Sequence, residues 1–251
     1  MGSPVQVLLW AWIILDSEVL SISLPEITDG KFIEECVSEH NRARSSVSPP
    51  ATNMLHMTWD EGLAITAGEW AKRCVFDHNP HLKDVRRMHP TFPSVGENVW
   101  TGHTQLFNVT RAIKKWVDEK VNYNYQMNTC SSICGHYTQV VWESSYKVGC
   151  AAQLCPNGVS NFDTKEGVVF VCNYATAGNI NGRRPYGSQE GACSGCKGTC
   201  VDGLCRYYWT PDWDHGLSYV TILIVRPIAL IVTFITGYAV HYFYPNAFCY
   251  E

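Results

Sequence analysis

The sequence is poor in charged side chains. Only 17% of its 251 residues are charged, and 19 Lys and Arg against 23 Asp and Glu leave a formal net charge of −4 at pH 7. A surface that binds nucleic acid needs an excess of positive charge, so this balance argues against such a partner. The one basic cluster, around Lys83, Arg86 and Arg87, is short, and we interpret it as a solvated loop.

Two common catalytic motifs are also absent. The chain has no Gly-x-Ser-x-Gly, the motif that presents the nucleophile of many hydrolases. It has no His-Glu-x-x-His, the helical zinc motif of many proteases. Internal repeats and low-complexity segments are missing as well, whereas a hydrophobic content of 46% is enough for a folded core.

Cysteine, by contrast, is abundant. Twelve cysteines indicate an oxidising compartment rather than the cytosol. The apolar run 7–15 has the length of a signal-peptide core, and the small residues Ser21 and Ser23 offer a cleavage site. We therefore predict a signal peptide over residues 1–23, entry into the secretory pathway and a mature chain that begins near Leu24.

A second apolar run lies near the C-terminus, over residues 219–244. About 25 residues at 1.5 Å each span a hydrocarbon core of ~30 Å. Arg226 interrupts the run, but it lies close enough to one end to reach the membrane surface. The sequence predicts a single-pass transmembrane helix here, followed by a short tail over 245–251. The alternative is a secreted protein with an apolar tail.

The pattern between these two runs predicts an α+β fold. Helices are expected from Thr28 or Asp29 to about Arg44, after Trp59-Asp60, and over 109–120. Strands are expected over 137–142, 147–153 and 168–174. The last strand is almost entirely apolar, which indicates burial on both faces. Helices first and strands later favour helices packed on a sheet.

A dense cysteine segment follows this region. Cys193, Cys196, Cys200 and Cys205 lie within thirteen residues and are separated by glycines, so covalent or metal links must hold the segment together. Two disulfides and a four-cysteine zinc site are the alternatives. The predicted extracellular location favours the disulfides.

Two motifs carry a resemblance to a known family. Gly135-His136-Tyr137-Thr138-Gln139 resembles one signature of the CAP superfamily (cysteine-rich secretory proteins, antigen 5 and pathogenesis-related proteins), and Cys172-Asn173-Tyr174 with Gly178-Asn179 resembles the other. The resemblance implies a three-layer α-β-α sandwich over 29–190, a cysteine-rich hinge over 191–206 and a linker over 207–218. Thr176 departs from the second signature, which affects that loop.

The resemblance also implies a set of disulfides. Six cysteines resemble the three-disulfide set of the plant branch of the family: Cys74, Cys130, Cys134, Cys150, Cys155 and Cys172. Cys36 falls on the inward face of the first predicted helix, so we predict a buried, inert thiol. Cys249 follows the predicted membrane segment.

Four further positions match the central cavity of the family. His78 and His136 match its two histidines, and Glu97 and Glu119 match its two carboxylates. We predict that the histidines bind Zn²⁺ weakly, with the carboxylates behind them. The two alternatives are general acid–base chemistry and a purely structural hydrogen-bonded network.

Within the family, the short hinge and the C-terminal segment resemble the glioma pathogenesis-related group. The expected function is non-enzymatic: a membrane-anchored or secreted extracellular protein that recognises a cell-surface protein or glycan. A sterol or lipid carrier is the first alternative, and a metal-dependent hydrolase is the second. Asn108 in Asn108-Val109-Thr110 is the predicted glycosylation site.

Overall fold

The computed structural model describes residues 24–84, 87–162, 165–206 and 226–243. Its first helix, α2 (Gly30–Ser45), begins where the sequence predicts. The Asp29 carboxylate accepts hydrogen bonds from the amides of Lys31 and Phe32, which satisfies two of the free donors at the helix start. Arg44, near the other end, is fully buried and donates to several main-chain carbonyls, those of Leu55, Val140, Trp142, Glu143 and Ser145.

The other two predicted helices also form. Asp60 caps α3 (Glu61–Ala71), and Asn108 caps α4 (Val109–Asp118) through its side-chain oxygen. The predicted end of the third helix at residue 120 lies inside η2 (Glu119–Asn122), a turn of 3₁₀ helix that continues α4. A second 3₁₀ turn, η1 (Thr104–Leu106), precedes α4.

The central sheet has the order β1-β5-β6-β2, with β1 (Thr58–Trp59), β5 (Lys147–Cys155), β6 (Gly167–Ala175) and β2 (Gly96–Gly102). β1 runs parallel to β5, and the other neighbours are antiparallel, so the sheet is mixed. Every residue of β6 is buried, as its apolar sequence predicts. The β2 strand was not predicted, because Gly96-Glu97-Asn98 has no apolar alternation.

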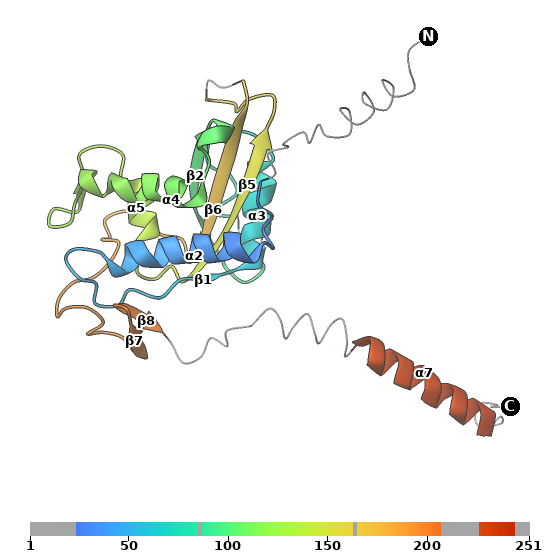
Figure 1. The fold of residues 1–251 in the computed structure, drawn as a ribbon. Coiled ribbons are helices and arrows are strands. Elements are labelled where there is room, and N and C mark those ends of the chain that lie inside the picture. Colours follow the sequence, from blue (N-terminus) through green and yellow to red (C-terminus); the bar gives the residue numbers. More distant parts are fainter. Residues whose placement is uncertain (1–23, 85–86, 163–164, 207–225, 244–251) are drawn as a thin grey trace, which may run out of the picture. The chain divides into compact units, whose positions relative to one another are not determined.

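Helices cover both faces of this sheet (Figure 1). On one face, Phe170 of β6 stacks on Trp116 of α4 and meets Phe32 of α2 edge-on. On the other face, Asn173 of β6 donates to the Thr66 hydroxyl of α3. Since side chains alternate along a strand, β6 contributes to two separate cores, and the α-β-α layering follows.

The prediction of a strand over 137–142 is wrong, because these residues belong mainly to the helix α5 (Gly135–Val140). Tyr137 through Val140 are all buried, so the chain shows no alternation of buried and exposed residues that would mark a strand. The helix start is stabilised from outside: the Glu119 carboxylate accepts hydrogen bonds from the amides of His136 (3.0 Å) and Tyr137 (3.4 Å). A long-range contact therefore decides the local structure.

Five disulfides link ten of the eleven cysteines of the first compact unit. They are Cys74–Cys155, Cys130–Cys134, Cys150–Cys172, Cys193–Cys200 and Cys196–Cys205. The hinge cysteines are thus oxidised in pairs, and the alternative of a zinc site there is not supported. Cys36 is a buried free thiol whose pKa is raised by burial first and by the nearby Glu35 charge second.

Two short hairpins complete this unit. β3 (Tyr123–Asn124) pairs with β4 (Thr129–Cys130), and β7 (Thr199–Val201) pairs with β8 (Leu204–Arg206) in the hinge. The hinge is hydrogen-bonded to the sandwich, since the Cys205 amide donates to Met54 O (2.7 Å) and the Cys193 amide to Ala51 O (3.1 Å). It is therefore part of the folded domain.

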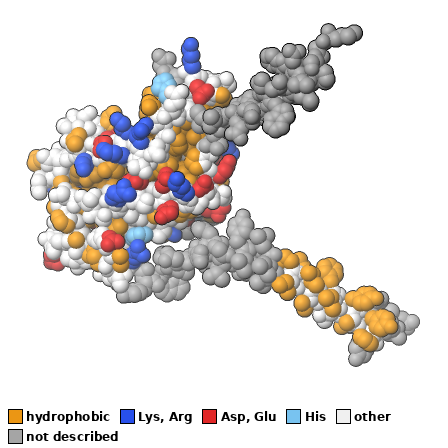
Figure 2. Space-filling model, in the orientation of Figure 1, with side chains coloured by type: hydrophobic (Ala, Val, Ile, Leu, Met, Phe, Trp, Pro, Cys, Tyr) orange, Lys and Arg blue, Asp and Glu red, His pale blue; other side chains and the backbone are white. Residues whose placement is uncertain are grey.

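The C-terminal unit contains one described helix, α7 (Arg226–Phe243), whose described side chains are largely exposed and apolar (Figure 2). The transmembrane helix predicted over 219–244 is not supported: among the described residues, no helix has both the length and the hydropathy for a membrane crossing. Arg226 and Pro227 open α7, and this lowers its mean hydropathy. The predicted signal peptide (1–23), the linker (207–218) and the tail (245–251), which contains Cys249, lie outside the described residues. Residues 219–225 and 244 of the predicted transmembrane segment lie outside them as well.

Candidate metal centre

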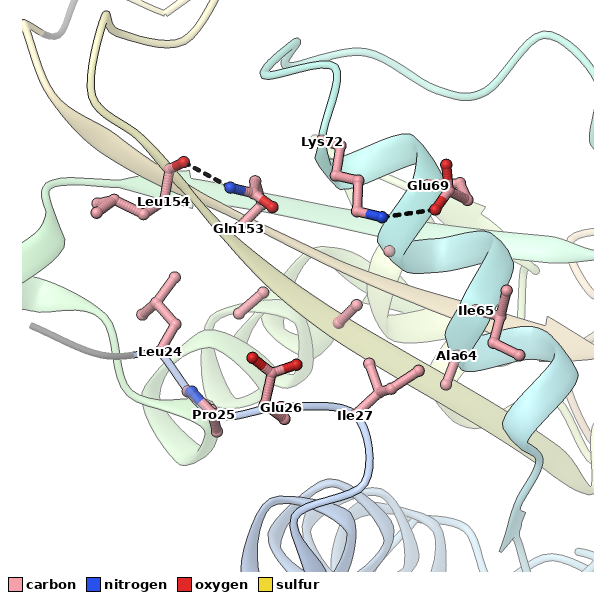
Figure 3. A pocket seen from close by; sticks show the side chains of 13 residues that line it. Leu24, Pro25, Glu26, Ile27, Ala64, Ile65, Glu69, Lys72, Gln153 and Leu154 are labelled. Carbon is pink, nitrogen blue, oxygen red and sulfur yellow. Dashed lines mark hydrogen bonds and ion pairs between the residues drawn. The ribbon is translucent and has the colours of Figure 1, made fainter.

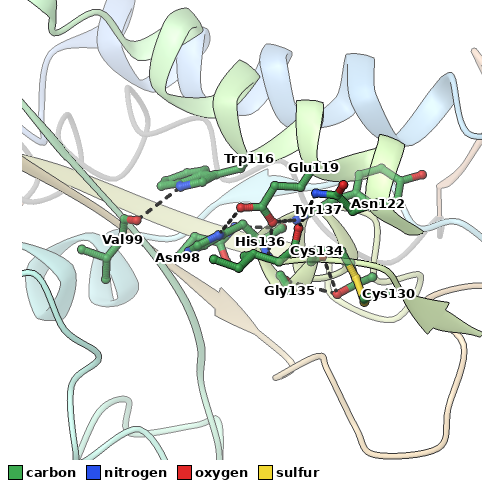
Figure 4. A network of polar contacts seen from close by, with 12 residues as sticks. Asn98, Val99, Trp116, Glu119, Asn122, Cys130, Cys134, Gly135, His136 and Tyr137 are labelled. Atoms are coloured by element: carbon green, nitrogen blue, oxygen red, sulfur yellow. Dashed lines mark hydrogen bonds and ion pairs between the residues drawn. A yellow bond between two sulfur atoms is a disulfide. The ribbon is translucent and has the colours of Figure 1, made fainter. Parts of the chain in front are cut away.

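The first histidine–carboxylate pair lies where η2 meets α5. The Nδ1 atom of His136 is 2.6 Å from Oε1 of Glu119, and the imidazole lies parallel to the Trp116 indole with ring centroids 6.2 Å apart (Figure 4). Only a quarter of the His136 side chain is exposed, and 18% of Glu119. Because Glu119 also caps α5, one carboxylate fixes both the helix start and the ring orientation.

The second pair joins the loop after α3 to the start of β2. Nδ1 of His78 is 3.0 Å from Oε1 of Glu97, and the same oxygen accepts the Asn79 amide at 2.9 Å. The His78 side chain is 58% exposed, whereas the Glu97 side chain is completely buried. Four residues upstream, the Cys74–Cys155 disulfide fastens the loop to the end of β5.

The electrostatics of the second pair favour a charged imidazole. The hydrogen bond to Glu97 raises the pKa of His78 above its usual value, against the opposing effect of partial burial. The other carboxylate oxygen of Glu97, Oε2, is buried and has no hydrogen-bond partner among the described residues. A buried carboxylate with a free oxygen can still accept one more donor or ligate a cation.

A buried polar chain links the His136 backbone to the far side of the core. Asn98, the neighbour of Glu97, donates through Nδ2 to the His136 carbonyl (3.0 Å) and to the Tyr174 hydroxyl (3.2 Å). That hydroxyl is 2.8 Å from Nε2 of His40, whose Nδ1 is 2.7 Å from the Cys36 carbonyl. This chain holds α2, β2, β6 and α5 together beside the candidate site.

Sequence reasoning missed this chain. His40 lies one helical turn after Cys36 on the predicted inward face of the first helix, and Asn98 directly follows Glu97, but neither residue was assigned a role from the sequence. A histidine on an apolar helix face was the one available signal, since a buried imidazole needs partners.

Both histidines engage their carboxylates through Nδ1, so Nε2 is the nitrogen left for a ligand. This is the arrangement found behind zinc-binding histidines, where the carboxylate fixes the tautomer and raises the basicity of the ring. The donor types therefore fit Zn²⁺, with two imidazoles as protein ligands and the remaining positions open. Among the described residues, the one group of three or more possible ligands within 4.8 Å of one another is formed by Cys193, Cys196 and Cys205, which are in disulfides.

The geometry offers no activated nucleophile beside either pair. Among the described residues, no Ser, Thr or Cys hydrogen-bonds to the ring of His78 or His136. Ser145, in the turn after α5, instead donates to the Thr176 carbonyl (2.6 Å) and accepts from Gln139 (3.2 Å). Nucleophilic catalysis requires a nucleophile in hydrogen-bond reach of its base, so the described residues do not form that arrangement.

The fold and the site together define an α-β-α sandwich that is cross-linked by disulfides and carries two histidine–carboxylate pairs. The model of the Cysteine-rich secretory protein family (CAP) matches residues 37–174. The chain belongs to this family.

Curated relatives place the chain more narrowly. It is 42% identical over 257 residues to Glioma pathogenesis-related protein 1 of Mus musculus, with 96% of each chain covered. It is 43% identical to GLIPR1-like protein 1 of Homo sapiens, over 74% of this chain and 76% of the relative. The resemblance to the glioma pathogenesis-related group is thereby confirmed.

One similar solved structure bears on the metal question. The crystal structure of NaASP2 with Zn²⁺ matches this chain with a TM-score of 0.55 and a sequence identity of 25%. The match covers 73% of this chain and all of NaASP2. The crystal structure of Na-ASP-1 has a TM-score of 0.56 at 24% identity and supports the fold alone. The predicted α+β CAP fold is confirmed.

Proposed function

We propose that this chain is a non-enzymatic extracellular interaction protein whose two histidines hold an exchangeable Zn²⁺. The observation that carries the proposal is that each imidazole is held through Nδ1 by a carboxylate, which leaves Nε2 for a ligand. The crystal structure of NaASP2 with Zn²⁺, a protein of the same fold, supports a zinc site in this chain. The disulfides support an oxidising, extracellular location.

In this proposal His78 and His136 are the protein ligands. Glu97 and Glu119 orient the rings and, as carboxylates, offset part of the positive charge of the ion. The bound zinc supplies a Lewis acid with open positions, which suits ligation of a group from a partner. Loops around the two pairs would then meet a protein or glycan on a cell surface.

Calorimetric titration of the purified full chain with Zn²⁺ tests the metal site. We expect one equivalent to bind, and binding to be lost when His78 and His136 are both replaced by alanine. His81→Ala is the matched control, because His81 is a partly exposed histidine of the same loop that pairs with Asp84 (2.8 Å). If the double variant titrates like the wild type, the assignment is wrong.

The interaction role needs a separate experiment. The full chain, labelled and applied to intact cells with and without zinc, should bind saturably, and the crosslinked species should be protein or glycoprotein. Extraction of a sterol from vesicles without saturable cell binding would favour the lipid-carrier alternative. Zinc-dependent cleavage of a peptide library, lost in the double histidine variant, would favour the hydrolase alternative instead.

A further inference from the structure

β5 is an edge strand over most of its length. β1 pairs only with Lys147 and Val148, so from Gly149 onward the described residues provide β5 with a neighbouring strand, β6, on one side alone. An open edge presents a row of unpaired amides and carbonyls, which is a template for another strand.

Two observations determine the direction of these groups. Val148 O accepts the Asp60 amide (2.9 Å), so this carbonyl points away from β6. Main-chain groups alternate in direction along an antiparallel strand, so Ala152 and Leu154 also point outward. The Cα atoms of Cys150 and Cys172 are 4.1 Å apart, the close spacing of a pair without mutual hydrogen bonds, and this gives the same alternation.

The outward groups are largely free. On the side of β5 that faces away from β6, neither the amide nor the carbonyl of Ala152 has a hydrogen-bond partner among the described residues. The Leu154 carbonyl is covered by the side chain of its own neighbour, since Gln153 Nε2 donates to it at 2.8 Å. The Leu154 amide likewise has no partner outside the sheet among the described residues. A strand that docked here would therefore find two free groups on Ala152 and one on Leu154.

A groove lies along this edge (Figure 3). It is a cavity of about 540 Å³ between the extended segment 24–27, α3 and β5. Four consecutive residues of β5, Ala151 to Leu154, line the cavity. A cavity on one face of the sheet would be lined by alternate residues only, so this cavity lies along the open edge of β5. Its volume falls in the range of ~300–1,000 Å³ typical of ligand sites.

The α3 wall of the groove is low because its residues are small. Ala64 and Gly68 line the cavity there, and a Cβ on Gly68 would come within 3.4 Å of the Ala151 Cβ. Exposed Ile65, with 49% of its surface accessible, stands at the rim. The groove thus combines an apolar wall with a main-chain ladder, which is the combination used when a domain binds a peptide as an added strand.

The charges of the groove leave one carboxylate unpaired. Glu69 and Lys72 neutralise each other at 2.6 Å across one turn of α3. Glu26, which extends toward β5 from the opposite wall (Figure 3), is exposed and has no described ion pair. A basic side chain on the occupant would meet this carboxylate.

We propose that the groove binds an extended peptide strand of a partner protein, which pairs with the outward groups of Ala152 and Leu154 and places a Lys or Arg against Glu26. This inference deepens the proposed interaction function and rests on it, but it uses no residue of the histidine pairs. The free amides and carbonyls favour a polypeptide over a lipid chain, because an acyl chain would bury them without a partner. The recessed edge favours a peptide over a second copy, because two grooves of the same shape do not interlock.

The test uses amide chemical shifts of the ¹⁵N-labelled full chain and three probes. The first is the capped pentapeptide Thr-Val-Lys-Val-Thr, and the other two carry N-methyl groups on its odd or its even residues. A strand on a single edge donates from alternate residues only, so one methylated peptide should bind like the parent and the other at least tenfold more weakly. The parent should shift the amides of Ala152 and Leu154.

Two charge variants complete the test. Glu26→Lys should weaken binding of the parent peptide several-fold, whereas Glu190→Lys makes the same charge change at an exposed residue that does not line the groove. Equal binding of both methylated peptides, displacement of the peptide by dodecanoate, or dimerisation of the chain through Ala152 would each overturn the proposal. Peptide binding without cell-surface binding would refute the proposed function alone, and cell-surface binding without peptide binding would refute this inference alone.

Discussion

Replacement of Tyr174 by phenylalanine measures how much the buried polar chain beside the candidate metal centre contributes to the stability of the fold. Tyr174 is completely buried, and its hydroxyl lies between His40 and Asn98. His40 Nδ1 donates to the Cys36 carbonyl, so Nε2 must accept, and the tyrosine hydroxyl donates to it. Asn98 then donates to the same hydroxyl oxygen.

The expected loss of unfolding free energy in Tyr174→Phe depends on which polar groups lose their hydrogen-bond partner. Asn98 keeps its hydrogen bond to the His136 carbonyl, whereas Nε2 of the buried His40 loses its only described partner. A buried acceptor without a partner costs about 1–3 kcal/mol, and loss of one oxygen atom leaves almost no cavity. We expect unfolding free energy to fall by about 2 kcal/mol, or Tm by ~4–8 °C for a domain of this size.

Urea denaturation at pH 7.4, followed by tryptophan fluorescence with disulfides intact, measures this change. Tyr146→Phe is the matched control, because it deletes the same atom from a tyrosine whose hydroxyl has no described hydrogen bond. The control should stay within ~0.5 kcal/mol of the wild type. If the two variants unfold at the same urea concentration, the Tyr174 hydroxyl does not join the two side chains and the polar chain is not a structural element.

Four other side chains should each have a measurable effect on zinc affinity, stability or glycosylation. Glu119→Gln should weaken zinc binding about 10–100-fold by calorimetry, while Asp118→Asn, an exposed neighbour paired with a lysine, should not. Burial lowers the pKa of His40 to about 4, whereas a histidine in the unfolded state binds its proton near pH 6.5. The unfolding free energy should therefore fall by about 3 kcal/mol as the pH is lowered from 6.5 to 4. An NMR titration that places the His40 pKa near 6.5 would refute this. Arg44→Lys should lower the unfolding free energy measured by urea denaturation by about 3 kcal/mol, because a lysine cannot replace the several donors of the buried guanidinium. Asn108→Asp should abolish a glycosidase-sensitive mobility shift without changing Tm, since aspartate preserves the helix cap.

Much of the site was predictable because its residues lie in short motifs. His78, Glu97, Glu119 and His136 were placed by resemblance alone, and the structure joins them as two pairs. The pairing itself was not predictable, since His78 and Glu97 are nineteen residues apart in sequence. They come together because Glu97 lies at the start of the β2 strand. That strand carries no apolar alternation by which it could be recognised.

The same division holds for the whole chain. Local sequence determined the helix starts at Asp29, Asp60 and Asn108, because a capping side chain needs only its own next three residues. It also determined the burial of β6, because a continuous apolar run has no other place in a folded domain. These features depend on neighbours in sequence or on composition.

Only the tertiary structure decided the helix α5 and the open edge of β5. The Glu119 carboxylate, which caps α5, lies seventeen residues before His136 in the sequence. Without this contact the sequence of Tyr137 to Val140 is equally compatible with a strand. The edge of β5 is free because β1 pairs with only two of its residues, and sheet order is not encoded in any one segment. Sequence patterns report local preference, whereas caps, edges and buried partners arise from residues that meet only in the folded chain.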